Sequence, residues 1–214
     1  MATRMFCDWR VVTLAYALLG LVLFALSTWL TTQPFGTGAL MAGQWLFIQP
    51  AGILLLCSPV LLPALLLKAT RRKAGRMLLF SLGGLLGAFC GMHIGSIGRW
   101  SGVRDFVQRS ETVVQAIHQY EQEHGQPPAD LQQLVPQYLA AIPSTGMGAY
   151  PHYEYHCGDD AYQGFRKNPW ALSVDTPQWG INFDMLVYLP NQNYPKEGYG
   201  GVLERVGSWA YVHE

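Results

Sequence analysis

Ligand-type side chains gather in the stretch HYEYHCGDD, which begins at His152. Alternate residues of a β-strand share one face, so His152, Glu154 and His156 would point the same way. Imidazole and carboxylate groups bind zinc, which makes these three the candidate ligands of a metal-dependent envelope enzyme. The outer two would lie roughly 13 Å apart along a regular strand, too far to share one ion without a bulge. A polar solvent face with the intervening tyrosines buried explains the same pattern, and we expect no metal here.

Motifs for other catalytic chemistry do not occur in the sequence. There is no Gly-x-Ser-x-Gly elbow, no phosphate-binding glycine loop and no His-Glu-x-x-His pair. The histidines elsewhere in the C-terminal half, His118, His124 and His213, are expected to be surface side chains. We predict a protein that is not an enzyme, with no catalytic residue and no cofactor.

The four cysteines are Cys7, Cys57, Cys90 and Cys157. Only Cys157 lies outside the apolar N-terminal half, so no disulfide framework can form within the C-terminal half. We expect buried free thiols, with an intermolecular disulfide through Cys157 as the alternative.

Charge divides the 214-residue chain into two unlike parts near Trp100. Before Arg99 there are seven Lys and Arg residues against one acid, Asp8, whereas from Arg99 onward there are seven basic and thirteen acidic residues. The formal net charge of zero therefore hides a basic part and an acidic part. We predict a membrane domain over 1–100 and an outer domain over 101–214. The acidic sign of the outer domain excludes nucleic acid as a partner.

Three apolar runs in the first part predict transmembrane helices: Val11–Leu30, Trp45–Leu67 and Met77–Gly98. Each has the roughly twenty residues that a helix needs to cross the hydrocarbon layer, and none contains Asp, Glu, Lys or Arg. The second run also contains three prolines that should kink its helix or break its ends: Pro50, Pro59 and Pro63.

The loops predict the orientation of these spans. The loop Lys68–Arg76 is strongly basic, whereas the loop Thr31–Gln44 has no charge. Because positive loops stay in the cytoplasm, we expect a multi-pass protein of a bacterial inner membrane with a cytoplasmic N-terminus and a periplasmic C-terminal domain.

Four glycines of the third run recur at every fourth position: Gly83, Gly87, Gly91 and Gly95. They would lie on one helical face, where a neighbouring backbone can approach closely enough for dispersion forces to hold the helices together in lipid. The partner could be the first two helices of the same chain. Alternatively, the stripe could join two copies in a homo-oligomer.

The second half should begin with an amphipathic helix. Apolar residues recur at spacings of three and four from Val103 to Tyr120, so the helix should continue outward from the third span, with a break at Gly102 as an alternative. Gly125 and the prolines that follow it should end this spine helix.

A short helix and a sheet should follow the spine helix. Asp130 is placed to cap a helix over Leu131–Leu139, which has one apolar face. Four segments rich in β-branched and aromatic residues then predict an antiparallel sheet of about four strands: 152–157, 171–174, 181–189 and 202–212. The fold class expected for the second half is therefore α+β.

Four short motifs between Ala116 and Pro143 carry a family resemblance: AIHQY, GQPP, LQQLVPQYL and IP. They resemble the joint between helix, turn and short helix in type IV pilins and the major pseudopilins of type II secretion, and the resemblance covers residues 103–143 best. The resemblance implies a pilin-like domain and an envelope location. Three spans would hold such a domain in the membrane, so we expect a fixed platform and not a polymerising subunit. Major pseudopilins also bind calcium, but the aspartates here lack the spacing of a calcium loop, so none is expected.

The C-terminal part is dense in aromatic residues, and such side chains make good anchors for a protein partner. The loop Pro190–Gly201 is long and turn-rich, and we expect it either to contact a partner or simply to join two strands. The candidate partner-binding residues are Tyr194, Tyr199, Trp170 and Trp179.

Together these features predict a non-enzymatic membrane protein that binds another protein and is embedded in the lipid bilayer. One setting is an accessory role in a secretion or pilus-like envelope system. The alternative is a membrane-tethered immunity protein that neutralises a toxin acting in the periplasm, where an acidic, aromatic-rich face would suit a basic partner.

Overall fold

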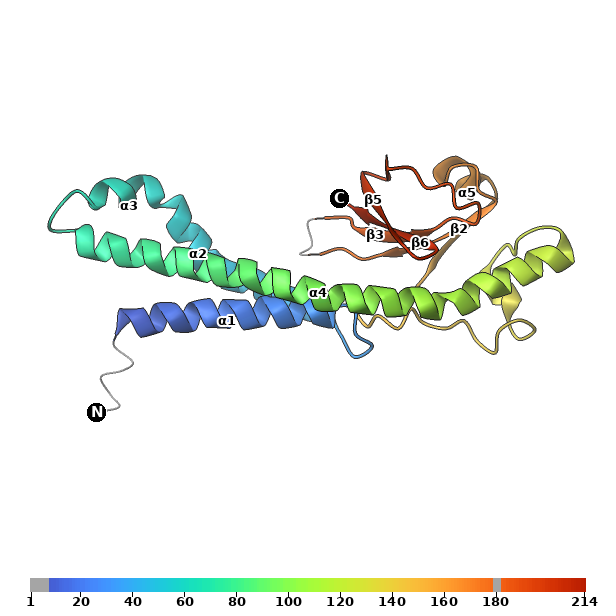
Figure 1. The fold of residues 1–214 in the computed structure, drawn as a ribbon, viewed down its shortest axis with the longest axis horizontal. Coiled ribbons are helices and arrows are strands. Elements are labelled where there is room, and N and C mark those ends of the chain that lie inside the picture. The colour runs from blue at the N-terminus through green and yellow to red at the C-terminus, as the bar shows by residue number, and fades with distance from the viewer. Residues whose placement is uncertain (1–7, 179–181) are drawn as a thin grey trace. The chain divides into compact units, whose positions relative to one another are not determined.

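The computed structural model of the protein describes residues 8–178 and 182–214 (Figure 1). The chain forms two compact units. The helical unit comprises the chain up to Leu30 together with Gly38–Arg99, and the sheet unit comprises Thr31–Thr37 together with Trp100–Glu214. A single helix, α4 (Arg71–His124), contributes its first part to the helical unit and its remainder to the sheet unit.

The helical unit contains two helices that are long and apolar enough to cross a membrane, α1 (Trp9–Leu30) and α4. This confirms long apolar helices for the first and third apolar runs. The second run is not one straight helix, because it forms α2 (Ala39–Leu56) and α3 (Ser58–Ala64), which are bent by 55° at their junction.

Proline explains where the second run breaks. Pro59 lies in the first turn of α3, a position at which the missing N–H costs nothing, whereas it would disrupt a continuing helix. The N–H of Cys57 still bonds to the Ile53 carbonyl, so α2 closes its last turn before the bend. Pro50 lies inside α2.

The glycine stripe of α4 packs against α1. A Cβ atom at Gly83 would lie 3.1 Å from Thr13 Cγ2, and one at Gly91 would lie 2.4 Å from the Leu21 carbonyl oxygen. Gly87 and Gly95 likewise face the carbonyl oxygens of residues 17 and 25 of α1. The two helices therefore touch at backbone distance. A second copy of the chain would have to use another face of α4, because α1 covers this one.

The contact pairs also set the direction of the two helices. Gly83 meets Thr13 and Gly95 meets Ala25, so the partners keep a constant offset of 70 in residue number. A constant offset means that α1 and α4 run parallel. The segment between them therefore has to return to the end at which α1 began.

In the sheet unit, α4 continues to His124 without the break considered at Gly102. Gly102 lies against Thr32, and a Cβ atom there would be 2.3 Å from the Thr32 hydroxyl oxygen, so this glycine permits a close contact and does not interrupt the helix. The predicted end is confirmed: Gly125 adopts a left-handed φ of 72°, and its N–H bonds to the Glu121 carbonyl at 2.8 Å.

The predicted short helix is shorter than expected. Only Leu131–Leu134 is helical, as a single 3₁₀ turn, and Val135 is already extended. Pro136 explains the early end, because the residue before a proline is pushed out of the helical region. The predicted cap is confirmed, since Asp130 Oδ1 accepts a hydrogen bond from the Gln132 N–H at 3.0 Å.

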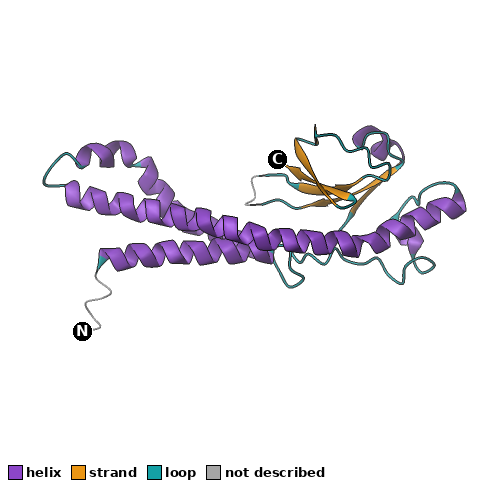
Figure 2. Ribbon diagram, viewed as in Figure 1, coloured by secondary structure: helices purple, strands orange, loops and turns teal. Residues whose placement is uncertain are grey.

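The sheet has six antiparallel strands in the order β1-β2-β3-β6-β5-β4. Figure 2 draws the strands in orange. The bounds are β1 Glu154–Cys157, β2 Trp170–Asp175, β3 Met185–Tyr188, β4 Glu197–Gly198, β5 Gly201–Val206 and β6 Trp209–His213. A short helix, α5 (Gly158–Gly164), separates β1 from β2. The fold class is thus α+β as expected, with six strands instead of about four.

The last predicted strand, 202–212, is a hairpin. Gly207 has a left-handed φ of 61° and reverses the chain between β5 and β6, where Val206 pairs with Trp209. β6 then lies between β5 and β3 and is buried along most of its length.

The apolar face of α4 packs on the sheet and forms the core of this unit. Phe106 meets the ring of Trp209 edge to face at 4.9 Å between centroids, and Trp170 stacks on Tyr188 at 5.4 Å. Five of the seven apolar positions indicated by the helical periodicity are buried: Val103, Phe106, Val113, Val114 and Ile117. The other two, Val107 and Tyr120, are partly buried.

Candidate partner-binding site

The three candidate metal ligands do not converge. Glu154 and His156 lie on the same face of β1, as alternation predicts, but His152 precedes the strand and lines a cavity elsewhere. Within residues 8–178 and 182–214, no group of three or more His, Cys, Asp or Glu side chains is arranged to hold a metal ion.

The side chain of His156 has a structural role. One ring nitrogen lies 2.8 Å from Asp160 Oδ2, and the other lies 3.0 Å from the hydroxyl of Ser173. Ser173 is the cross-strand neighbour of Glu154 and donates to its carboxylate at 3.4 Å. This chain of contacts ties α5 to β1 and β2.

The predicted contact loop is anchored by Tyr194. Its hydroxyl accepts a hydrogen bond from the Leu189 N–H and donates to the Ser208 carbonyl, both at 2.8 Å. The guanidinium of Arg205 covers its ring at 4.2 Å. Burial raises the pKa of the Tyr194 hydroxyl. This tyrosine therefore holds the loop onto the sheet.

The other partner-binding candidates occupy different environments. Trp170 is 0% exposed and belongs to the core, so it cannot be a surface anchor. Tyr199 is partly buried and stacks on Phe165 at 5.6 Å between ring centroids. Trp179 lies outside the described residues.

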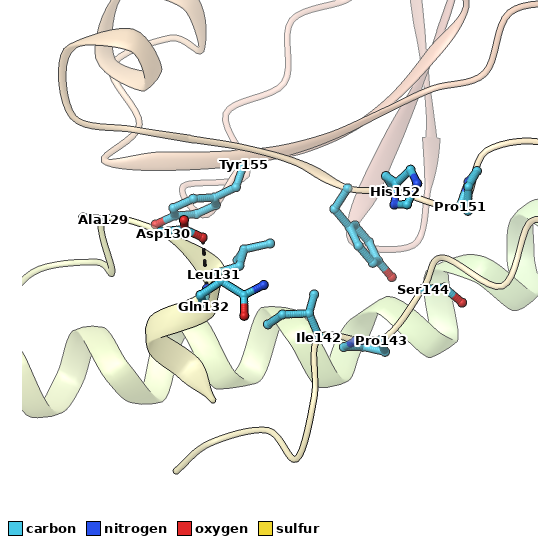
Figure 3. A pocket seen from close by; sticks show the side chains of 11 residues that line it. Ala129, Asp130, Leu131, Gln132, Ile142, Pro143, Ser144, Pro151, His152 and Tyr155 are labelled. Carbon is cyan, nitrogen blue, oxygen red and sulfur yellow. Dashed lines mark hydrogen bonds between the residues drawn. The ribbon is translucent and has the colours of Figure 1, made fainter. Parts of the chain in front are cut away.

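A cavity of about 640 Å³ opens on the sheet unit at a place that the sequence did not indicate (Figure 3). It is lined by residues 129–132, by 142–144, and by 151–153 together with Tyr155. Figure 3 shows Tyr155 beside Asp130 and Leu131, with His152 and Pro151 farther along the same wall and Ile142 and Pro143 opposite.

A second cavity, of about 540 Å³, also has Ala129 in its wall. Its lining includes Pro127 and Pro128, the start of α5 at Gly158, and Tyr162. Residues 127–130 therefore form a ridge between the two cavities, and we call this segment the Pro-Pro ridge.

Hydrogen bonds fix the Pro-Pro ridge in place. Tyr155 donates its hydroxyl hydrogen to the Pro128 carbonyl at 2.7 Å, and the Ala129 N–H donates to Gln133 Oε1 at 2.9 Å. The thiol of Cys157 lies 3.4 Å from the Ala129 carbonyl oxygen. The ridge is thus held from β1 and from its own 3₁₀ turn, which presents the two cavities as one preformed surface.

The surface around the ridge is acidic. Residues 110–165 contain seven Asp and Glu residues and no Lys or Arg. Six of the seven are exposed, and the seventh, Glu121, accepts a hydrogen bond from the Trp170 indole N–H at 3.3 Å. A cationic ligand would be attracted to the carboxylates at the cavities, such as Asp130. One cation also lies near the larger cavity, because the Arg109 Nε donates to the Thr145 carbonyl at 3.3 Å and Arg109 acts on the hydroxyl of Tyr153.

One of these carboxylates, Glu123, has a pKa that is lowered by a neighbouring hydroxyl group. Tyr138 donates a hydrogen bond to Glu123 at 2.6 Å, which holds the pKa of Glu123 below its usual value, with a further contribution from the Gln119 amide. The same bond raises the pKa of Tyr138 to about 12. Glu123 is therefore a charge that persists into mildly acidic solution.

No protein-family model, curated protein sequence or solved structure matches this chain. Neither cavity was predicted from the sequence because each wall combines separate segments of the chain, from Ala129 to Tyr155 in the larger cavity and from Tyr120 to Pro169 in the smaller one. The clue in the sequence was the long acidic stretch without a single Lys or Arg.

Proposed function

We propose that this is a membrane-anchored binding protein whose sheet unit captures a basic segment of a protein partner. The observation that carries the proposal is the pair of cavities on either side of the Pro-Pro ridge, set in a stretch of 56 residues, 110–165, that has seven carboxylates and no cation. Charge complementarity of this kind accelerates encounter and selects against acidic partners.

The lining chemistry supports a peptide segment as the ligand. Tyrosines, prolines and Ile142 offer apolar and aromatic contact area, and Asp130 adds a carboxylate at the edge. The ridge is rigidly held before any partner arrives, so little conformational entropy is lost on binding.

Binding, and not catalysis, is also supported by how the ionisable groups are used. His156 is held between Asp160 and Ser173, and His213 pairs with Glu204 at 2.9 Å. These two imidazoles hold elements together and lie outside both cavity linings, whereas His152 lines the larger cavity without belonging to any metal-holding group of three or more His, Cys, Asp or Glu among the described residues.

The membrane anchor is proposed to have three spans. Because α1 and α4 run parallel, a chain that crosses with both has to cross back between them, and the bent pair α2 and α3 is the apolar helical segment available. The 18 residues of α2 rise about 27 Å, close to the thickness of the hydrocarbon layer, before α3 adds its own length.

The basic loop at the start of α4 supports an orientation with that loop in the cytoplasm and the sheet unit in the periplasm. In this setting the platform would serve a secretion or pilus-like system, in keeping with the pilin resemblance of residues 103–143. The acidic surface also suits a basic toxin, so immunity is the second candidate. An alkaline phosphatase fusion after Glu214 should be active, and an inactive fusion would overturn the orientation.

Site-specific photocrosslinking in the full chain tests the binding surface. The crosslinker is placed at Gln132 or Ser144, both exposed in the larger cavity, and at exposed Val202 on β5 as a matched control. We expect one product from the two cavity positions, with a crosslinked peptide rich in Lys and Arg, and none from Val202. The identity of the crosslinked protein distinguishes the two candidate functions, because it is either a component of a secretion system or a toxin. Equal labelling at all three positions would contradict the proposal.

A further inference from the structure

A third cavity, of about 470 Å³, lies within the helical unit where α1 and α4 begin. Five basic side chains and one indole line it, together with two leucines and a glycine. The charged and aromatic members are Trp9, Arg10, Lys68, Arg71, Arg72 and Arg76.

The protein supplies almost no negative charge to balance these cations. Asp8 is the only acidic residue before residue 100, and its Oδ1 already accepts a hydrogen bond from the Arg10 N–H at 3.0 Å. The first turn of α4 contains no acidic residue, although the N-terminus of a helix favours anions. Five cations around one hollow repel one another, so an anion from outside would stabilise the arrangement.

Two arginines are arranged around the indole of Trp9. The Cζ atom of Arg76 lies 5.6 Å from the ring centroid, and that of Arg10 lies 5.9 Å away. The Nε atom of Arg76 is buried and has no hydrogen-bond partner among the described residues. A guanidinium N–H that is withdrawn from water and unpaired costs free energy, and a phosphate oxygen is the acceptor it fits best.

The surroundings of the cavity are apolar. Leu65 and Leu79 line it, and the neighbouring Leu66 and Leu67 are 87% and 62% exposed. A cationic hollow bordered by exposed leucines matches a molecule with an anionic head and hydrocarbon tails. A free phosphate ion would use the cations and leave the leucines uncovered.

We propose that this cavity binds the headgroup of an anionic phospholipid, with the phosphate against Arg72 and Arg76 and the acyl chains along the leucines. The inference rests on the proposed membrane crossing of α1 and α4. Basic pockets between membrane helices are suited to such headgroups, and each nearby Lys or Arg strengthens attraction to an anionic leaflet. The Trp9 indole would lie at headgroup level, where tryptophan is favoured.

The test uses the full chain reconstituted in vesicles of phosphatidylcholine with a minor fraction of phosphatidylglycerol. After detergent extraction, lipid retained by the protein is counted by native mass spectrometry. We expect phosphatidylglycerol to be enriched at least tenfold over its share in the vesicles. The double variant R72Q/R76Q should lose this enrichment. The control variant K73Q should keep it within twofold, because Lys73 lies in the same first turn of α4 as Arg72 but does not line the cavity.

Three results would overturn the inference. The first is retention of phosphatidylglycerol by the wild-type protein in proportion to its share in the vesicles, a comparison that needs no variant. The second is an equal loss in K73Q and R72Q/R76Q, which would indicate a diffuse basic surface. The third is release of the lipid by millimolar inorganic phosphate, which would indicate a free-anion site. Vesicle flotation after alkaline carbonate washing separates these outcomes from failure of the membrane anchor, because a protein that floats without lipid preference refutes this site alone.

Discussion

Gly87 of α4 lies directly against the backbone of Ala17 in α1: a Cβ atom on Gly87 would be 2.0 Å from the Ala17 carbonyl oxygen. No side chain can occupy that space, and a backbone carbonyl cannot rotate away as the tip of a flexible side chain can. The contact between α1 and α4 therefore depends on the absence of one methyl group.

The substitution Gly87→Ala should separate the two helices locally. We expect the free energy of unfolding of the full chain in detergent to fall by about 1–3 kcal/mol, the usual cost of overpacking. Gly75→Ala is the matched control in the same helix, because its Cβ would lie 3.7 Å from Leu65 Cδ2, which is ordinary contact. There we expect no loss, and a gain of up to about 1 kcal/mol from helix propensity. Denaturation in sodium dodecyl sulfate measures both, and equal effects would contradict the close packing.

The hydroxyl of Tyr153 is buried without a hydrogen-bond partner in the described structure, and burial raises its pKa to about 12, against a smaller opposing effect of Arg109. A raised pKa means that folding favours the protonated form. The stability that this group contributes is complete below pH 10 and is lost as the pH rises from 10 to 12.

We therefore expect Tyr153→Phe to flatten the decline in stability between pH 10 and 12, by up to about 2–3 kcal/mol relative to the wild type. At pH 7 the variant should be as stable as the wild type, or about 1 kcal/mol more stable, because it removes an unsatisfied hydroxyl. Urea titrations followed by tryptophan fluorescence provide both values. Marked destabilisation at pH 7 would show that the hydroxyl has a partner.

The lowered pKa of Glu123 can be tested by titration at acidic pH. Its pKa is held low by the Tyr138 hydroxyl, so its stabilising contribution is present above its ordinary pKa and is lost as the pH falls through the lowered value. Tyr138→Phe should raise the pKa of Glu123, as measured by carboxyl carbon NMR titration. Tyr162→Phe is the control, because Tyr162 is exposed on α5. An unchanged Glu123 titration in the Tyr138 variant would refute the assigned cause.

Asp184 ties the C-terminal end of the sheet to the loop before β3. Its carboxylate is buried and accepts from the Tyr211 hydroxyl at 2.7 Å, from the Gln178 amide at 3.0 Å and from the Glu214 N–H at 3.0 Å. Asp184→Ala should cost about 3 kcal/mol or more, because it leaves buried donors unpaired.

The control is Asp175→Ala, which removes an exposed carboxylate at the end of β2 and should change stability by less than about 0.5 kcal/mol. Both variants are compared by chemical denaturation of the full chain. Similar losses in the two variants would argue against a special role for Asp184.

The sequence predicted best those features that depend on neighbouring residues. Gly125 ends α4 and Asp130 caps the next turn because the required chemistry lies within four residues of each site. The extension of that turn to Leu139 was wrong, because the effect of Pro136 on Val135 outweighs the apolar periodicity. The hairpin of β5 and β6 was read as one strand because only Gly207 interrupts a long run of strand-forming residues.

Features that bring distant segments together were not predictable from local pattern. The Gly148 N–H bonds to the Gln33 carbonyl at 2.8 Å, so the uncharged loop after α1 is part of the sheet unit. The cavity walls combine Asp130, Ile142 and Tyr155 in the same way. Hydrophobic periodicity indicates which face of an element is buried, but it does not say which other segment covers that face.

The constant offset between the partners of α1 and α4 has a consequence for biosynthesis. The glycines of α4 that pack against α1 lie 70 positions later in the chain than the residues they contact, as Gly87 does relative to Ala17. At about 5–20 residues per second, the ribosome takes several seconds to make the intervening segment, so at first α1 can pack only against α2, whose Phe47 carbonyl accepts a hydrogen bond from the Tyr16 hydroxyl. The face of α1 that contacts the four glycines is then covered only when residues 83–95 of α4 have been made, so packing of α1 against α4 is a late step in assembly of the helical unit.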